Sequence, residues 1–284
     1  MLDTLVNDIY KVLEEGQEGY AFERFGERSQ SILQSRTDPD SGPHSSRVRF
    51  SNVGSPCVRQ LWYKLHKADE AEPLLPHNRL KFLYGELIEE MLLELVRASG
   101  HSVDFEQAVV EKEGVEGHID CVIDGVLVDV KSASPFSFKK FEGGLRSEDD
   151  AFGYLGQLGG YLTAIQDDER FSQVAKDRAA FLAVNKVSGE ICLDVHTFDE
   201  QKLKEIAETN GRNKVSAEGE TTPERAFEDV AEGKSGNRKL DVNCSYCQFK
   251  NQCWPELRTF LYSRGPVFLT KVEREPDVFE VKND

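Results

Sequence analysis

The sequence lacks any apolar run approaching the roughly 18 residues that a membrane-spanning helix needs. It also lacks a secretory signal, because residues 1–16 alternate acidic and apolar side chains as an amphipathic helix does. Apolar and charged residues make up 39% and 30% of the chain, as in an ordinary globular protein. We therefore expect a cytoplasmic protein that does not interact with membranes.

Positive charge is scarce in this chain. Lysine and arginine number 35 against 51 aspartates and glutamates, which gives a formal net charge of −16. Proteins that are held on nucleic acid by bulk charge need clustered basic residues, so this composition argues against that class. It leaves room for an enzyme with a narrow basic channel on an acidic body.

Cysteines are few, and their spacing separates them into two groups. Cys121 and Cys192 stand within apolar strand-like patterns and are interpreted as small core residues. The other group includes Cys244-x₂-Cys247-x₅-Cys253, and thiols this close together indicate a metal site.

Zinc and an iron–sulfur cluster would both require a fourth ligand in addition to these three. Cys57, 187 residues before Cys244 (244 − 57), is the candidate. Such a site would join the two ends of a domain, and stability would then depend on the metal.

The stretch GHIDCVIDGVLVDVK, residues 117–131, predicts a β-hairpin. Asp124-Gly125 is a preferred dipeptide for a two-residue turn, and apolar residues flank it on both sides. Continued outward, this register places Asp120 opposite Asp129, and it places His118 opposite Lys131.

Two carboxylates at opposed positions repel each other, so they need a stabilising partner. A divalent cation such as Mg²⁺ or Mn²⁺ would supply one, because these ions prefer oxygen ligands. The alternative is a solvated sheet face without a metal, since the pattern of two aspartates and a lysine is common by chance.

Periodicity along the rest of the chain predicts a mixed sheet flanked by helices. Residues 16–54 are expected to be polar loop. The hairpin's carboxylates are expected to face a cleft between the helices at 78–99 and 150–166. The other expected elements are a short helix near residue 61, a strand over 103–112, a second hairpin turning at Ser188-Gly189, and helices over 199–209 and 222–231.

Taken together, the order of these motifs resembles one family. A cysteine before the fold, then D…DxK, then Q-x-x-x-Y at Gln157 and Tyr161, then C-x₂-C-x₅-C is similar to the RecB-like exonucleases of the PD-(D/E)XK superfamily, in the branch with a [4Fe–4S] cluster. That branch includes AddAB-type nuclease subunits, CRISPR adaptation nucleases and stand-alone phage exonucleases. The length and the lack of a helicase motif make the phage type the closest match, which would place the protein in the host cytoplasm.

The resemblance implies a fold, a domain organisation and a set of ligands. The fold is an α/β nuclease core closed by an Fe–S clasp. The expected parts are an N-terminal helix and linker (1–56), the nuclease domain (57–253), and a C-terminal helix and tail (254–284). The implied ligands of the [4Fe–4S] cluster are Cys57, Cys244, Cys247 and Cys253.

The same resemblance assigns the catalytic residues. Asp120 matches the family's metal-binding aspartate, and Asp129 and Lys131 match the (D/E)xK pair. Val130 would offer its carbonyl to Mg²⁺ or Mn²⁺. Gln157 and Tyr161, one helical turn apart, would address the same site.

One position departs from the family pattern. The family often has G-x-x-x-H on the helix before the sheet, and here the segment starting at Gly85 has Glu89 in place of the histidine. Glutamate is a suitable ligand for a hard cation. The helical wheel alone does not separate Glu89 from Glu86 and Glu90, so its assignment depends on the motif, and a solvated acidic face is the alternative.

The implied function is metal-dependent hydrolysis of DNA ends, single- or double-stranded, in recombination, repair or degradation. The alternatives are a zinc- or Fe–S-clasped DNA-binding or assembly protein without catalysis, an endonuclease, and a CRISPR-type end-processing nuclease. A recombination or single-strand-binding protein is a candidate partner. Candidate DNA contacts are Arg59, Ser132, Lys139 and Lys140, the last two interleaved with Phe136, Phe138 and Phe141.

Overall fold

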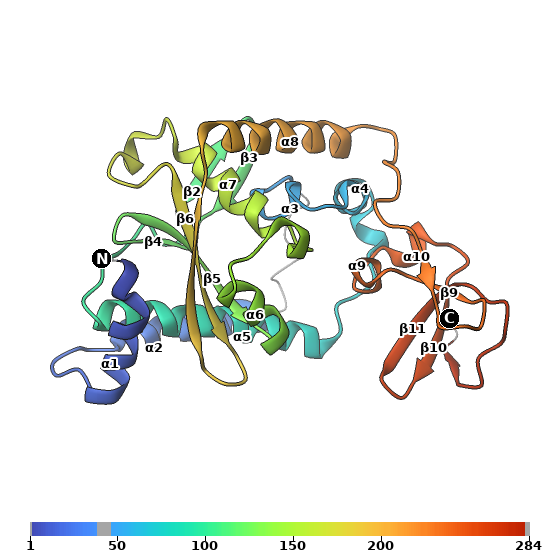
Figure 1. Cartoon of the computed structure of the whole chain (residues 1–284), viewed down its shortest axis with the longest axis horizontal. Helices are drawn as coiled ribbons and strands as arrows, with labels where there is room; N and C mark the ends of the chain where they lie inside the picture. Colours follow the sequence, from blue (N-terminus) through green and yellow to red (C-terminus); the bar gives the residue numbers. More distant parts are fainter. Residues whose placement is uncertain (1, 39–46, 282–284) are drawn as a thin grey trace. The chain divides into compact units, whose positions relative to one another are not determined.

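The computed structural model describes residues 2–38 and 47–281, and Figure 1 traces the chain through them. The contacts between residues divide the chain into two compact units, Met1–Gly54 with Leu75–Arg212, and Ser55–Leu74 with Asn213–Asp284. Within the described ranges, no helix is both long and apolar enough to cross a membrane.

The first unit is built on a five-stranded mixed sheet of order β1-β4-β5-β6-β7, in which β5 and β6 are parallel and the other pairs are antiparallel. Its strands are β1 (Val103–Asp104), β4 (Cys121–Ile123), β5 (Val126–Ala133), β6 (Arg178–Asn185) and β7 (Ile191–Thr197). A separate two-stranded sheet contains β2 (Val109–Lys112) and β3 (Val115–His118). The helices of this unit are α1 (Leu5–Glu15), α2 (Glu23–Thr37), α3 (Phe50–Val53), α5 (Pro76–Ala98), α6 (Pro135–Glu142) and α7 (Tyr154–Ile165), with short 3₁₀ turns at Leu2–Thr4, Ser147–Asp149 and Glu169–Phe171. α8 (Glu200–Glu218) begins in the first unit and ends in the second. The expected mixed sheet flanked by helices is therefore confirmed.

The β4–β5 hairpin forms in the predicted register. Cys121 pairs with Val128 and Ile123 with Val126, around a turn in which Asp124 and Gly125 both have positive φ, +47° and +77°. A two-residue connection of this type needs two left-handed residues, and Asp-Gly is a dipeptide that adopts them readily. The second predicted hairpin, β6–β7, also forms.

A core of apolar side chains fixes the sheet against two helices. One sheet face contributes Cys121 and Val128, and it packs on Leu92 and Leu93 of α5 and on Ile9 of α1. These five side chains are 0–1% exposed. Because side chains alternate along a strand, the neighbouring Asp129 and Lys131 of β5 point to the opposite face, towards α6 and α7.

The chain departs from the predicted hairpin just before β4. The β4–β5 ladder ends at Cys121–Val128, and His118 pairs with Val109 of β2 instead of lying opposite Lys131. The bend occurs because the backbone at Ile119 and Asp120 bonds to the 107–108 segment, through N–H···O contacts of 3.1 Å. The predicted strand over 103–112 is likewise split into β1 and β2, with positive φ at two residues between them.

Part of the predicted polar loop is helical. α2 covers residues 23–37, although none of its side chains is buried. It lies on α5 through ion pairs that join Arg24 to Glu94, Arg28 to Glu90 and Arg36 to Glu86. Apolar periodicity could not reveal this helix, because ionic contacts and not an apolar face attach it. Residues 39–46 of the predicted loop lie outside the described residues.

The second unit combines short helices with a small five-stranded sheet of order β12-β10-β11-β9-β8. Its helices are α4 (Val58–His66), α9 (Val242–Ser245) and α10 (Lys250–Cys253), with a 3₁₀ turn at Ala68–Glu70. Its strands are β8 (Val230–Ala231), β9 (Arg238–Lys239), β10 (Arg258–Tyr262), β11 (Gly265–Lys271) and β12 (Glu280–Val281). The short helix near residue 61 is confirmed as α4. Two expectations are wrong, because residues 222–231 form no helix and residues 254–281 form strands instead of a C-terminal helix.

Candidate active site

Three carboxylates from distant parts of the sequence gather at the start of the hairpin. Glu89 comes from α5, Asp120 from the bend before β4, and Asp129 from β5. Burial, together with the charges of Asp120 and Asp129, raises the pKa of Glu89 to about 9. Burial and the charge of Asp129 likewise raise the pKa of Asp120 to about 7. The charges of neighbouring carboxylates thus oppose the ionisation of Glu89 and Asp120.

Asp129 is the most deeply enclosed of the three. It is 2% exposed, and the ammonium of Lys131, two residues further along β5, forms an ion pair with its Oδ2. Burial opposes the charge on Lys131, but Asp129 and Asp120 outweigh it and raise the lysine's pKa. Lys131 is therefore charged at neutral pH and offsets part of the negative charge.

The predicted Q-x-x-x-Y pair on α7 does reach this group. Gln157 Nε2 is 3.3 Å from Asp129 Oδ1 and 3.0 Å from the Tyr161 hydroxyl, as expected for residues one turn apart. Tyr161 is buried against Gly117, where an added Cβ would lie only 2.6 Å from the tyrosine ring. The glycine of GHID is therefore required by the position of Tyr161.

Asp120 is held by the backbone of β5. Its Oδ2 accepts the N–H of Val130 at 2.8 Å. Val130 is buried at 7% exposure, with its side chain in the core on the opposite sheet face. Asp120 thus contacts β5 beyond Val128, where the pairing of β4 with β5 ends.

The three glutamates of α5 that the helical wheel left unseparated have different surroundings in the structure. Glu86 pairs with Arg36, and buried Glu90 accepts two bonds from Arg28, at 3.0 and 2.8 Å. Glu89 is the one whose charge interacts with Asp120 and Asp129.

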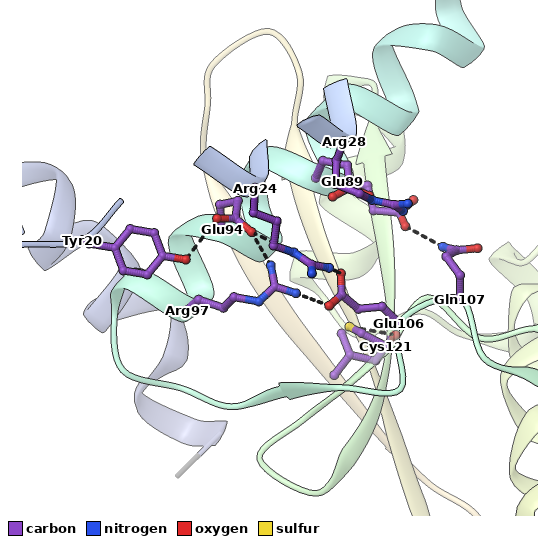
Figure 2. A network of polar contacts seen from close by, with 11 residues as sticks. Tyr20, Arg24, Arg28, Glu89, Glu94, Arg97, Glu106, Gln107 and Cys121 are labelled. Atoms are coloured by element: carbon purple, nitrogen blue, oxygen red, sulfur yellow. Dashed lines mark hydrogen bonds and ion pairs between the residues drawn. The ribbon is translucent and has the colours of Figure 1, made fainter. Parts of the chain in front are cut away.

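Figure 2 shows how Glu89 is held at the end of a polar network. Gln107 Nε2 donates to Glu89 Oε1 at 3.0 Å. Further along, Glu106 lies between Arg24 and Arg97. No sequence pattern indicated Gln107, which lies between two strand fragments in a positive-φ conformation, +53°.

The donor chemistry of this group suits a hard divalent cation, since all the side-chain donors are oxygens. In addition, Asp129 Oδ2 is buried and forms its ion pair with the Lys131 ammonium. Among the described residues, however, no three His, Cys, Asp or Glu side chains are arranged so that they could hold a metal ion. Each carboxylate is turned towards a protein donor, from Gln107, Val130 or Lys131, and these contacts would have to be exchanged for a metal.

The cysteine group lies in the second unit. Burial, together with the charges of Cys57, Cys253 and Cys247, raises the pKa of the Cys244 thiol to about 12. Cys57 and Cys247 are raised in the same direction. The four thiols are therefore near enough to interact, but the expected ligand cluster is not formed: they are free cysteines, and within the described part of the chain they do not make a metal-binding group. Of the two predicted core cysteines, Cys121 is fully buried and Cys192 only half-buried.

The four candidate DNA contacts differ in their surroundings. Arg59 is engaged within the second unit, where it donates to Pro223 O at 2.7 Å and to the Tyr63 hydroxyl at 3.3 Å. Lys139 is exposed on α6. Ser132 and Lys140 line a cavity next to Lys131.

A model of the PD-(D/E)XK nuclease superfamily matches residues 10–254. No curated protein matches the chain. Among solved structures, SSO0001 is 12% identical with a TM-score of 0.43, covering 83% of this chain and 97% of the other. The alkaline exonuclease LHK-Exo of Laribacter hongkongensis is 12% identical with a TM-score of 0.43, covering 66% and 92%, and its complex with dAMP gives 12%, 0.41, 66% and 92%.

Proposed function

Because the chain belongs to the PD-(D/E)XK nuclease superfamily, we propose that it is a metal-dependent exonuclease that hydrolyses phosphodiester bonds at DNA ends. One observation carries the proposal. Glu89, Asp120 and Asp129 gather beside Lys131, although they oppose one another's ionisation. A fold does not keep such a group for stability, so a role in chemistry explains it best.

The carboxylates of Glu89, Asp120 and Asp129, with the carbonyl of Val130, would hold Mg²⁺ or Mn²⁺. When bound, the ion would polarise the scissile phosphate and lower the pKa of a water molecule. The carboxylates would bind it in their charged form, so binding releases the protons that the raised pKa values of Glu89 and Asp120 retain.

Lys131 has two roles in this proposal. Its charged ammonium holds Asp129 in place before substrate arrives, through their ion pair. With DNA bound, the ammonium would neutralise the charge that develops on the phosphate in the transition state. Gln157, which contacts both Asp129 and the Tyr161 hydroxyl, would position this carboxylate.

We also propose that Cys57, Cys244, Cys247 and Cys253 bind a [4Fe–4S] cluster in the second unit. The support is the spacing of the cysteines and the mutual effect of their charges. Thiols whose pKa is raised by burial remain protonated, so cluster assembly would have to deprotonate them and draw them together. The cluster would adjoin a small group of buried aromatic side chains, Trp62, Tyr63 and Phe249, against which Cys247 and Cys253 pack.

A comparison of linear and closed circular DNA as substrates distinguishes an exonuclease from an endonuclease and from a protein without nuclease activity. The parent chain with Mg²⁺ or Mn²⁺ should shorten end-labelled linear DNA and leave closed circular DNA intact. Lys131→Ala should lose this activity, and Lys11→Gln, at an exposed position on α1, should keep it. Cleavage of circular DNA would indicate an endonuclease, and no cleavage of either DNA by the parent would refute the proposal.

A further inference from the structure

A cavity of about 220 Å³ lies next to Lys131 at the end of β5. Its walls come from Ser132–Ser134 after the lysine, from α6, and from the segment that leads into α7. Lys186 belongs to the lining too, because its backbone N–H donates to Ala133 O at 3.0 Å and brings the end of β6 beside β5. Lys131 thus contacts Asp129 on one side and lines the cavity on the other.

The cavity lining is more basic than the chain as a whole. It contains Lys131, Lys140 and Lys186 against Asp149 and Asp150, in a protein of net charge −16. Asp150 already accepts the first backbone N–H groups of α7, at 2.9 and 2.8 Å. Its charge is therefore used in capping the helix, and the lining can accept an anion such as a phosphate.

Aromatic side chains lie in the lining of this cavity and next to it. Phe152 is 65% exposed, and its ring lies 5.5 Å from that of Tyr154, which in turn lies 4.7 Å from the ammonium of Lys131. Phe136 is 75% exposed, with Lys140 Nζ at 5.2 Å from its ring. Exposed rings beside lysines are the combination that stacks bases and holds the backbone of single strands.

We propose that this cavity receives one unpaired nucleotide of the DNA strand, with its base stacked on Phe152 and its phosphate near Lys140 and Lys186. The inference rests on the proposed nuclease function, and it adds a preference for single-stranded ends. At about 220 Å³ the cavity is smaller than the roughly 300–1,000 Å³ of sites for drug-sized ligands, so it has no room for a base pair. A duplex end would have to unpair before entering.

The test compares cleavage of three matched DNAs: a single strand, the same strand with an abasic terminal nucleotide, and the blunt duplex. The parent should cleave the intact single strand fastest. Phe152→Ala should slow that reaction about 5- to 150-fold, the effect of one base stacked on an aromatic side chain. The same variant should hardly change cleavage of the abasic strand, because that strand has no base to stack. Phe279→Ala, at a 71% exposed position in the other unit, is the matched control and should resemble the parent.

An equal loss on intact and abasic strands would overturn the proposal, and so would a parent that prefers the duplex. Thermal unfolding of Phe152→Ala should match the parent, since the ring is exposed. If the parent cleaves no DNA, the nuclease function fails, and binding of the same three DNAs measured by fluorescence anisotropy still tests the cavity. Equal binding of intact and abasic strands by the parent would then exclude it.

Discussion

Burial raises the pKa of Glu89 and Asp120 in the carboxylate group and of Cys244 in the cysteine group, but the two groups differ in their protein partners. The carboxylates come from α5, the bend before β4 and β5, and protein donors contact each of them. The cysteines come from short helices and their ends, and burial raises the pKa values of Cys57, Cys244 and Cys247. We therefore expect the first unit to fold around its site without a metal, whereas the aromatic group beside the cysteines of the second unit is small.

The largest expected effect is on catalysis at the carboxylate group. Asp129→Asn should lower DNA cleavage by about 10³-fold or more, because it removes a charged metal ligand and the partner of Lys131. Cleavage rates at saturating Mg²⁺ measure this loss. Asp167→Asn, at an 84% exposed side chain, is the control and should cleave like the parent. DNA cleavage by Asp129→Asn at the rate of the parent would show that Asp129 is not part of the active site.

At the cysteine group, Cys244→Ser should lower bound iron and stability together. Loss of a structural metal unfolds the segment that binds it, so the midpoint of the corresponding unfolding transition should fall by several degrees or more. Iron analysis and calorimetry measure both quantities. Cys192→Ser on β7 should leave iron unchanged. Full iron in Cys244→Ser would show that Cys244 is no ligand.

The metal-free protein should lose stability as pH rises. Asp120 and Glu89 have folded pKa values of about 7 and about 9, above their ordinary values, so the folded state binds more protons than the unfolded state. The contribution is present near pH 4 and is lost as pH rises through these values, by roughly 1–3 kcal/mol after allowance for solvent screening.

Chemical unfolding at pH 5 and pH 9 measures this loss. Added Mg²⁺ should restore stability at pH 9 by binding the ionised carboxylates. Glu89→Gln should flatten the profile, because it removes one of the titrating groups. A metal-free protein that is equally stable at both pH values would contradict the assignment.

The smallest expected effect concerns Gln107, which donates to Glu89. Gln107→Ala should raise the Mg²⁺ concentration for half-maximal cleavage about 10-fold and leave the rate at saturating Mg²⁺ nearly unchanged. Gln201→Ala is the control, because Gln201 donates a hydrogen bond to an exposed glutamate, Glu205, on α8. A lower saturating rate with unchanged Mg²⁺ dependence would assign Gln107 a different role.

Local patterns predicted the parts of the fold that local chemistry determines. The Asp124-Gly125 turn, the helix of α5 and the pairing of Gln157 with Tyr161 follow from turn preference and helical spacing. The bend at Asp120 did not, because it depends on backbone bonds to a segment 11–13 residues earlier.

The C-terminal strands were also missed, because their faces are half-exposed and their apolar alternation is weak, although β10 and β11 form a local hairpin. Gln107 in the active site was likewise not predicted from the sequence. Its role depends on where the fold places it beside Glu89, and its residue type gives no indication of this.

The attachment of α2 has a consequence for measurements in solution. Arg24, Arg28 and Arg36 join it to α5, and none of its side chains is buried. The screening length of salt shortens from about 10 Å at 0.1 M to about 3 Å at 1 M, so amide hydrogen exchange in α2 should accelerate over this range. Part of the salt dependence of DNA binding should therefore come from loosening of α2 in the protein. If the whole dependence were assigned to the DNA, the number of counterions released from it would be overestimated.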